Sequence, residues 1–299
     1  MFDSIKRGFG FLGQALDMAR QDGDLIKPSL YGLVVGAVAS LIGAVPIVIA
    51  ALLVGGSDLG NVVVGALGAG LIFVQYAIAY IFSGMTAYLV YGFLAEGDGR
   101  MDRAWEIVRR DWLDILSLAA ASTLVKIVEG FVRGRGRSRN PLRETLANLL
   151  EGVWTSATYF ILPAMIIEDL NLPQALKRAT EIIRKNLLLV AVTEIGVSGV
   201  VGLVGGLLGV VAVLLGVGLF LAFAAAGEPT LMLAGGVAAV LTAGTLLAVI
   251  SAASSYVTTA YHTCMFLWAR DAERAVAHGA SAQSVRAPEP VAAVLGMAP

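Results

Sequence analysis

Six long apolar runs constrain the fold of this chain most strongly, because they predict helices in a lipid bilayer. Short polar segments separate the runs, which cover residues 29–55, 62–95, 113–132, 148–167, 187–226 and 231–268. Each run reaches the roughly 20 residues that a helix needs to cross the hydrocarbon core. Only 14% of the residues are charged, against about 25% in soluble domains, so most of the folded surface must face lipid. The expected fold class is all-α, a polytopic integral membrane helical bundle with six long spans.

The composition also excludes several classes of function. A net charge of −1 argues against a general nucleic-acid binder, and a single cysteine excludes a disulfide framework and a Cys-rich zinc site. The sequence carries no P-loop, no GxSxG or HExxH motif and no Rossmann fingerprint. We therefore expect a protein that is not an enzyme, with no cofactor, no metal and no nucleic-acid partner.

The fifth and sixth runs are unusually long. At 1.5 Å per residue each would make about 60 Å of helix, twice the hydrocarbon thickness, so residues 187–268 form either two long spans or four short ones. Neither run contains a charged or proline-bearing turn, which favours two.

The first twenty residues are typical of an amphipathic helix and lack the features of a secretory signal. Apolar residues recur at steps of three and four, at Phe2, Ile5, Phe9, Leu12 and Leu16. Such a helix lies in the membrane interface with its apolar face among the acyl chains. The alternative is a helix that packs on other protein.

Three short segments share one pattern, in which an alanine is followed by an acid, an apolar pair, an arginine and a final Asp or Asn. They are Ala15–Asp22, Ala104–Asp111 and Ala179–Asn186, and each precedes an apolar run. The acid and the arginine are spaced i, i+3, so we expect them to pair in water while the apolar pair faces lipid. We expect the final Asp or Asn to lie where an in-plane helix turns into a spanning one.

This repeat predicts three units, each an interfacial helix followed by a transmembrane hairpin. The units cover about residues 1–96, 97–168 and 169–269, and a cytoplasmic tail covers 270–299. The alternative is that any interfacial helix carries an acid and a base before a span.

The lysines and arginines predict the orientation, because they gather in cytoplasmic segments. In the six-span arrangement they place both termini in the cytoplasm. One loop is the exception, with five arginines, Arg133, Arg135, Arg137, Arg139 and Arg143, on the outer side. These arginines either contact anionic lipid outside the cell, or residues 113–167 do not fully cross. Because the repeat preserves parity, we expect the loop to be external.

Small residues fall at strict four-residue intervals in the first run, at Gly32, Gly36, Ser40 and Ala44. Such a line is typical of close helix packing, although a chance pattern in an Ala- and Gly-rich segment is the alternative. We expect Pro46 and Pro163 to mark kinks that face the bundle interior, where neighbours satisfy the freed carbonyls.

Ionisable residues at membrane depth are the candidates for a functional site. Lys126 and Glu129 are spaced i, i+3 and either neutralise each other or extend toward the interface. Glu194 lies two turns into the fifth run, where it binds a cation or proton or belongs to a continued in-plane helix. His262 is a structural hydrogen-bonded residue or, less simply, part of a metal or proton site.

A series of degenerate motifs follows the same order as in a known family. They are Tyr88–Phe93, Ala104-Trp105-Glu106, Ile127-Val128-Glu129 with the arginine-rich loop, Trp154, Tyr159–Pro163, Glu168 and Gln174–Ala179. Over most of its length up to about Gly209, the chain resembles an uncharacterised family of prokaryotic multi-pass membrane proteins, a domain of unknown function. That family is distantly similar to the membrane portions of some glycerophosphodiester phosphodiesterases and to YciC-type proteins. The resemblance implies a prokaryotic inner membrane and assigns no catalytic or binding residue.

Two hypotheses for the function follow. The first is an oligomeric structural or assembly component of a prokaryotic cell membrane, which contacts the bilayer and a second copy or a membrane-complex partner through small-residue faces and the C-terminal tail. The second is a pore or carrier for a small solute or ion, suggested by the repeats, the two prolines and the charges at membrane depth.

Overall fold

The computed structural model describes residues 2–133, 141–185 and 187–279, together with residues 281, 285, 287, 288 and 292. The side chains of residues 2–5 and 185–196 lie outside this description. Helices make up nearly all of the described residues, which contain no strand. Six of the helices are long and apolar enough to cross a membrane, which confirms the expected class of helical membrane protein.

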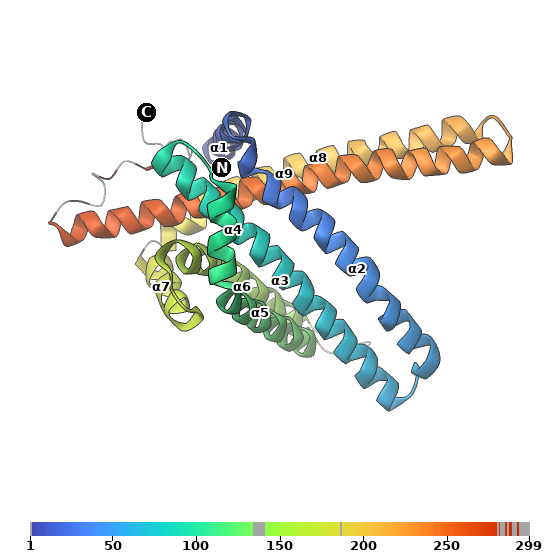
Figure 1. Ribbon diagram of the computed structural model, residues 1–299, viewed down its shortest axis with the longest axis horizontal. Helices are drawn as coiled ribbons and strands as arrows, with labels where there is room; N and C mark the ends of the chain where they lie inside the picture. Colours follow the sequence, from blue (N-terminus) through green and yellow to red (C-terminus); the bar gives the residue numbers. More distant parts are fainter. Residues whose placement is uncertain are drawn as a thin grey trace.

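Short and long helices follow one another in a regular order. The short ones are α1 (Phe2–Gln21), α4 (Met101–Arg110) and α7 (Leu172–Lys185). The long ones are α2 (Lys27–Val54), α3 (Asp58–Glu96), α5 (Trp112–Arg133), α6 (Pro141–Glu168), α8 (Leu187–Ala224) and α9 (Pro229–Ala277). Each short helix precedes two long ones that lie side by side as a hairpin (Figure 1).

The two longest apolar runs form one helix each, as the lack of an internal turn predicted. α8 and α9 meet at a turn that ends with Pro229, the first residue of α9. At 1.5 Å per residue they are about 57 and 74 Å long, so this hairpin must tilt or extend beyond the hydrocarbon core. α9 also continues to Ala277, past the expected start of the tail at residue 270, because Ala272 is buried and Asp271 pairs with Arg274.

The helices converge in one region, which we call the base. There α1 lies against α8 and α9, beside the point from which α2 and the α8–α9 hairpin diverge (Figure 1). The Phe11 ring meets the Tyr261 ring edge to face at 5.3 Å, and the Tyr256 hydroxyl donates a hydrogen bond of 2.9 Å to the Ala15 carbonyl. These aromatic rings are among the largest fully buried side chains of the protein. The base is therefore the core.

The face that α1 buries differs from the predicted apolar stripe. Phe9 is 46% exposed, whereas Phe11, Ala15 and Met18 are buried against protein. The other short helices do the same through Val108 and Ile182, so the expectation that the apolar pairs face lipid is wrong. The physical reason lies in the first residue of each repeated segment. The alanines at this position, Ala15, Ala104 and Ala179, are fully buried, and their small side chains let each helix sit close to its neighbours.

The expected acid–base pairs form only in part. Asp17 pairs with Arg20 at 3.0 Å, but Glu106 pairs with Arg103 at 3.3 Å, and no ion pair joins Glu181 to Arg184 among the described side chains. The expected partner of Glu106, Arg109, lies instead over the Trp105 ring, 5.1 Å from its centre. The final acids of the first two segments do lie at bends, since Asp22 caps the short helix before α2 and Asp111 separates α4 from α5. Asn186 lies outside the described residues.

The line of small residues on α2 packs against α3 within the same chain. A Cβ at Gly32 would lie 3.0 Å from Phe82, and Gln75 of α3 donates hydrogen bonds of 3.0 Å to the Gly36 carbonyl and to the Ser40 hydroxyl. Ala44, the fourth member of the line, is exposed instead. Close packing is therefore confirmed for three of the four positions, and this face is already occupied before any partner binds.

The two helix-interior prolines differ in their surroundings. Pro163 is buried in α6, as expected, whereas Pro46 is exposed on α2. The expectation that both prolines face the bundle interior is wrong for Pro46, because the part of α2 around it packs on one side only, against α3.

Close packing of α8 on α9 gives a direct test. A Cβ at Gly216 would lie 2.8 Å from the Ala243 Cβ and 3.2 Å from the Ala239 carbonyl oxygen, neither of which can rotate away. We expect Gly216→Val to lower stability by about 1–3 kcal/mol, measured as the midpoint of thermal aggregation in detergent. Gly218→Val is the matched control, because a Cβ there meets nothing within 4 Å. Equal midpoints for the two variants would contradict this packing.

Candidate functional site

Four charged side chains form a closed cluster between α5 and α6. The Lys126 ammonium lies 2.7 Å from the Glu129 carboxylate and 3.0 Å from the Glu151 carboxylate. The Arg133 guanidinium lies 2.7 Å from Glu129 and 3.2 Å from Glu151. Arg133 also donates a hydrogen bond of 2.9 Å to the Asn148 side chain. Two positive and two negative charges thus sum to zero.

The cluster confirms one predicted contact and adds two residues. The Lys126–Glu129 pair forms as the i, i+3 spacing allowed, and Glu129 is the most buried member, with only 4% of its side chain exposed. Glu151 could not be found from local spacing because it lies 25 residues beyond Lys126, on another helix. A buried carboxylate is tolerable only when it is paired, and here it has two cationic partners. This arrangement holds α5 and α6 together near the end of the hairpin where α5 finishes and α6 begins.

His262 lies inside the bundle, in contact with aromatic rings. Its ring stacks on that of Tyr159, with centres 3.8 Å apart and planes 10° apart. Its Nδ1 is 2.7 Å from the Thr258 carbonyl oxygen, one turn earlier in α9. A cavity of about 70 Å³ beside it is lined mainly by apolar and hydroxyl groups, Tyr80 and Thr259 among them. These contacts favour the structural reading of His262 over the metal or proton site.

The remaining predicted site residues are only partly described. Glu194 belongs to α8, but its side chain lies outside the described part, so its predicted role stays a prediction. Of the five arginines proposed to contact lipid, Arg135, Arg137 and Arg139 lie outside the described residues. Arg133 is bound by two carboxylates and Arg143 is exposed. The contact of these five arginines with anionic lipid therefore stays a prediction.

Ion pairs at the base join segments far apart in the chain, and sequence reasoning missed them. Arg178 of α7 donates hydrogen bonds of 2.9 and 3.3 Å to both oxygens of Glu168, at the end of α6, and another to Glu273 of α9. Burial lowers the pKa of Arg178, but its hydrogen bonds to the two carboxylates outweigh this effect and raise the pKa. The guanidinium therefore stays charged and holds α6, α7 and α9 together.

Two further contacts join segments that lie far apart in the chain. The Gly99 amide donates a hydrogen bond of 2.6 Å to Asp22, 77 residues earlier. Arg110 lies 2.9 Å from Asp169, in the connection between α6 and α7. Asp22 was expected only to mark a bend, and no local signal points to its partner Gly99.

The described side chains contain no group of three or more His, Cys, Asp or Glu that could hold a metal ion. Comparison with protein-family models and with curated proteins finds no match to this chain. The resemblance to an uncharacterised prokaryotic family therefore stays a prediction.

The charge cluster predicts a graded loss of stability. Glu129→Gln leaves Lys126 and Arg133 to share the Glu151 carboxylate, so we expect it to cost about 1.5–3 kcal/mol. Glu151→Gln should cost less than about 1 kcal/mol, because Glu151 is 45% exposed and its partners stay hydrated. Exposed Glu144 on α6 is the control, and Glu144→Gln should leave stability unchanged.

Thermal aggregation midpoints of the three variants, measured in one detergent, provide the test. A Glu129→Gln midpoint equal to that of Glu144→Gln would show that the cluster contributes nothing to stability.

Proposed function

We propose that this chain is a non-enzymatic component of a prokaryotic inner membrane that assembles with a second copy of itself. It has three units, about residues 1–96, 97–168 and 169–269, each with one interfacial helix and one transmembrane hairpin. Support comes from the order of the helices, in which α1, α4 and α7 each precede a pair of long apolar helices.

The charges support one orientation of these units. Lys27, Arg100 and Arg270 lie near the starts or ends of long helices at the base, whereas the turn from Gly55 to Ser57 and the turn before Pro229 carry no basic residue. Since basic residues gather on the cytoplasmic side, we place the base and both termini in the cytoplasm and the tips of the α2–α3 and α8–α9 hairpins outside. The arginine-bearing tip of the α5–α6 hairpin is the exception to this rule, and we place it outside because the order of three hairpins preserves parity.

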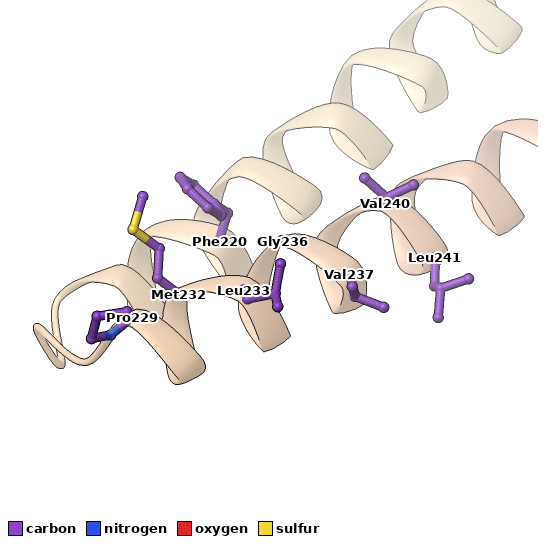
Figure 2. A pocket seen from close by; sticks show the side chains of 8 residues that line it. All are labelled: Phe220, Pro229, Met232, Leu233, Gly236, Val237, Val240 and Leu241. Atoms are coloured by element: carbon purple, nitrogen blue, oxygen red, sulfur yellow. The ribbon is translucent and has the colours of Figure 1, made fainter.

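One observation carries the proposal of assembly, an apolar groove near the tip of the α8–α9 hairpin. The groove has a volume of about 660 Å³ and is lined by apolar side chains and by Gly236 (Figure 2). Leu233, Val240 and Leu241, which belong to this lining, are strongly exposed. In lipid, helices associate by close packing over small residues such as this glycine.

The partner that we propose for the groove is the same hairpin of a second copy, in a twofold arrangement that places α9 against α9. A twofold contact uses one patch twice, so the groove and the exposed leucines of each copy serve as both halves of the interface. The small-residue face of α2 is not available for this purpose, because it packs on α3.

A carrier has less support. Of the four residues considered for a transport site, Lys126, Glu129 and His262 are bound within the protein, and the side chain of Glu194 lies outside the described part. A transport site needs groups that can release a protein partner and bind the solute instead. Lys126, Glu129 and His262 each have a protein partner at close range.

Filling the groove tests the proposal. A Cβ at Gly236 would meet Phe220 only at 3.9 Å, an ordinary contact, so Gly236→Leu fits within its own chain and obstructs only a partner. We expect this variant to lower the dimer fraction at least tenfold, measured by single-molecule photobleaching in vesicles at low protein density. Gly218→Leu is the control, because Gly218 lies in open space on α8 and outside the groove lining, and this variant should dimerise as the wild type does.

Two results would overturn the proposal. One is a monomeric wild type at every protein density, and the other is an equal effect of both leucine variants.

A further inference from the structure

A cavity lies where α2, α3 and α9 meet, and its lining is mainly apolar with four serines and one glutamine among the apolar side chains. Its volume is about 250 Å³. Ser29 of α2, Ser83 and Gln75 of α3, and Ser251 and Ser255 of α9 supply the polar groups, and no charged residue lines it. Within the part of the chain that the structure describes, these four serine hydroxyls form no hydrogen bond. Ser29 is only 8% exposed, and a buried hydroxyl without a protein partner indicates that another molecule bonds to it, whereas Ser251 and Ser255 are exposed.

The depth of the cavity matches the headgroup level of a bilayer leaflet. Ser255 directly precedes Tyr256, whose hydroxyl bonds to α1 at the base. Ser29 is the third residue of α2, next to the charged start of that helix at Lys27. The cavity therefore lies at the base end of the spans, close to the interfacial helices.

Apolar helix surfaces continue outward from the cavity. α2 and α9 diverge from a point beside α1 (Figure 1). Beyond the cavity α2 exposes Val34, Val38 and Leu41, and α9 exposes Leu247 and Val249. The serine hydroxyls of the cavity lie near the interface, and apolar surfaces lead from it toward the bilayer centre. This order matches that of a lipid, from the polar headgroup to the acyl chains.

We propose that this cavity holds the uncharged glycerol headgroup of a membrane lipid of the diacylglycerol class, whose acyl chains lie along α2 and α9. The volume is slightly below that of pockets for drug-sized ligands, which start at roughly 300 Å³, so it suits a headgroup and not a whole lipid. The serine hydroxyls donate to the ester carbonyls and accept from the free hydroxyl of the glycerol. Since no lysine or arginine lines the cavity, an anionic phosphate headgroup finds no counter-charge there.

This site is separate from the groove near Gly236, so it does not depend on dimer formation. It adds to the proposed function a lipid class that the protein recognises in the cytoplasmic leaflet.

Photochemical labelling of the full-length protein tests the proposal. The protein is reconstituted in phosphatidylcholine vesicles that contain a diacylglycerol with a diazirine near the glycerol end of one acyl chain. Labelling is measured by intact mass and located by peptide mapping. We expect labelled peptides from α2, α3 and α9 around the cavity, and we expect unlabelled diacylglycerol to compete.

The variants use serines on two faces of one helix. Ser251→Ala combined with Ser255→Ala removes two hydroxyls from the cavity and should lower labelling at least fivefold. Ser254→Ala is the control, because Ser254 lies on the α8 side of α9, near Gly205. It should label as the wild type does, and equal aggregation midpoints show that all three proteins fold.

Several results would overturn the proposal. Labelling that is unchanged in the double variant, or spread evenly over all lipid-facing helices, would exclude a site at this cavity. Equal competition by phosphatidic acid would exclude selectivity for an uncharged headgroup, and competition by soluble glycerol would indicate a water-soluble ligand. Disulfide-linked dimers of Ser251→Cys in a Cys264→Ala background would place a second copy there instead.

Discussion

The packing of α1 against α9 closes the chain on itself and holds the base together. Ala15 and Tyr256 are 241 residues apart, yet a hydrogen bond joins them, and Phe11 meets Tyr261 one turn away. α2 and α3 of the first hairpin also contact α9 directly, so the contact through α1 adds to the packing of the first hairpin on the last one. α2 and the α8–α9 hairpin start beside α1 and then diverge (Figure 1). The cavity lies where α2, α3 and α9 meet, and the α8–α9 hairpin extends away from the base.

Lipid imposes a second constraint, because it offers no hydrogen-bond partners. The charged groups within the α5–α6 hairpin therefore pair with one another. The His262 ring bonds to the Thr258 carbonyl and stacks on the Tyr159 ring. The serines of the cavity are different, since their hydroxyls have no partner among the described residues. That difference separates groups that stabilise the fold from groups that are free to bind a lipid.

The fold could be predicted from the sequence to the extent that it depends on local pattern. Apolar runs give six long helices, and the absence of a turn within residues 187–268 gives two helices there. The small-residue line of α2 predicts close packing, although its partner α3 is known only from the structure. The face of α1 was misassigned because hydropathy alone does not distinguish burial in lipid from burial in protein. For Met18, neighbouring helices provide that burial.

Contacts between distant segments could not be predicted in this way. Glu151 and Arg178 bond to residues 10 to 95 positions away, and a single sequence read alone carries no signal for such pairs. The cavity was missed for a similar reason, because its serines, one on α2, one on α3 and two on α9, form no common pattern until the helices meet.

Accessibility of single cysteines tests most directly the central claim that three hairpins cross the membrane from one base. In a Cys264→Ala background, cysteines replace Asp58, Arg143 and Glu228 near the three tips, and Arg103 and Lys177 at the base. In intact cells an impermeant thiol reagent should label all three tip positions, and the base positions only after permeabilisation. Labelling of Arg143→Cys only after permeabilisation, with the other two tips labelled from outside, would contradict six full crossings.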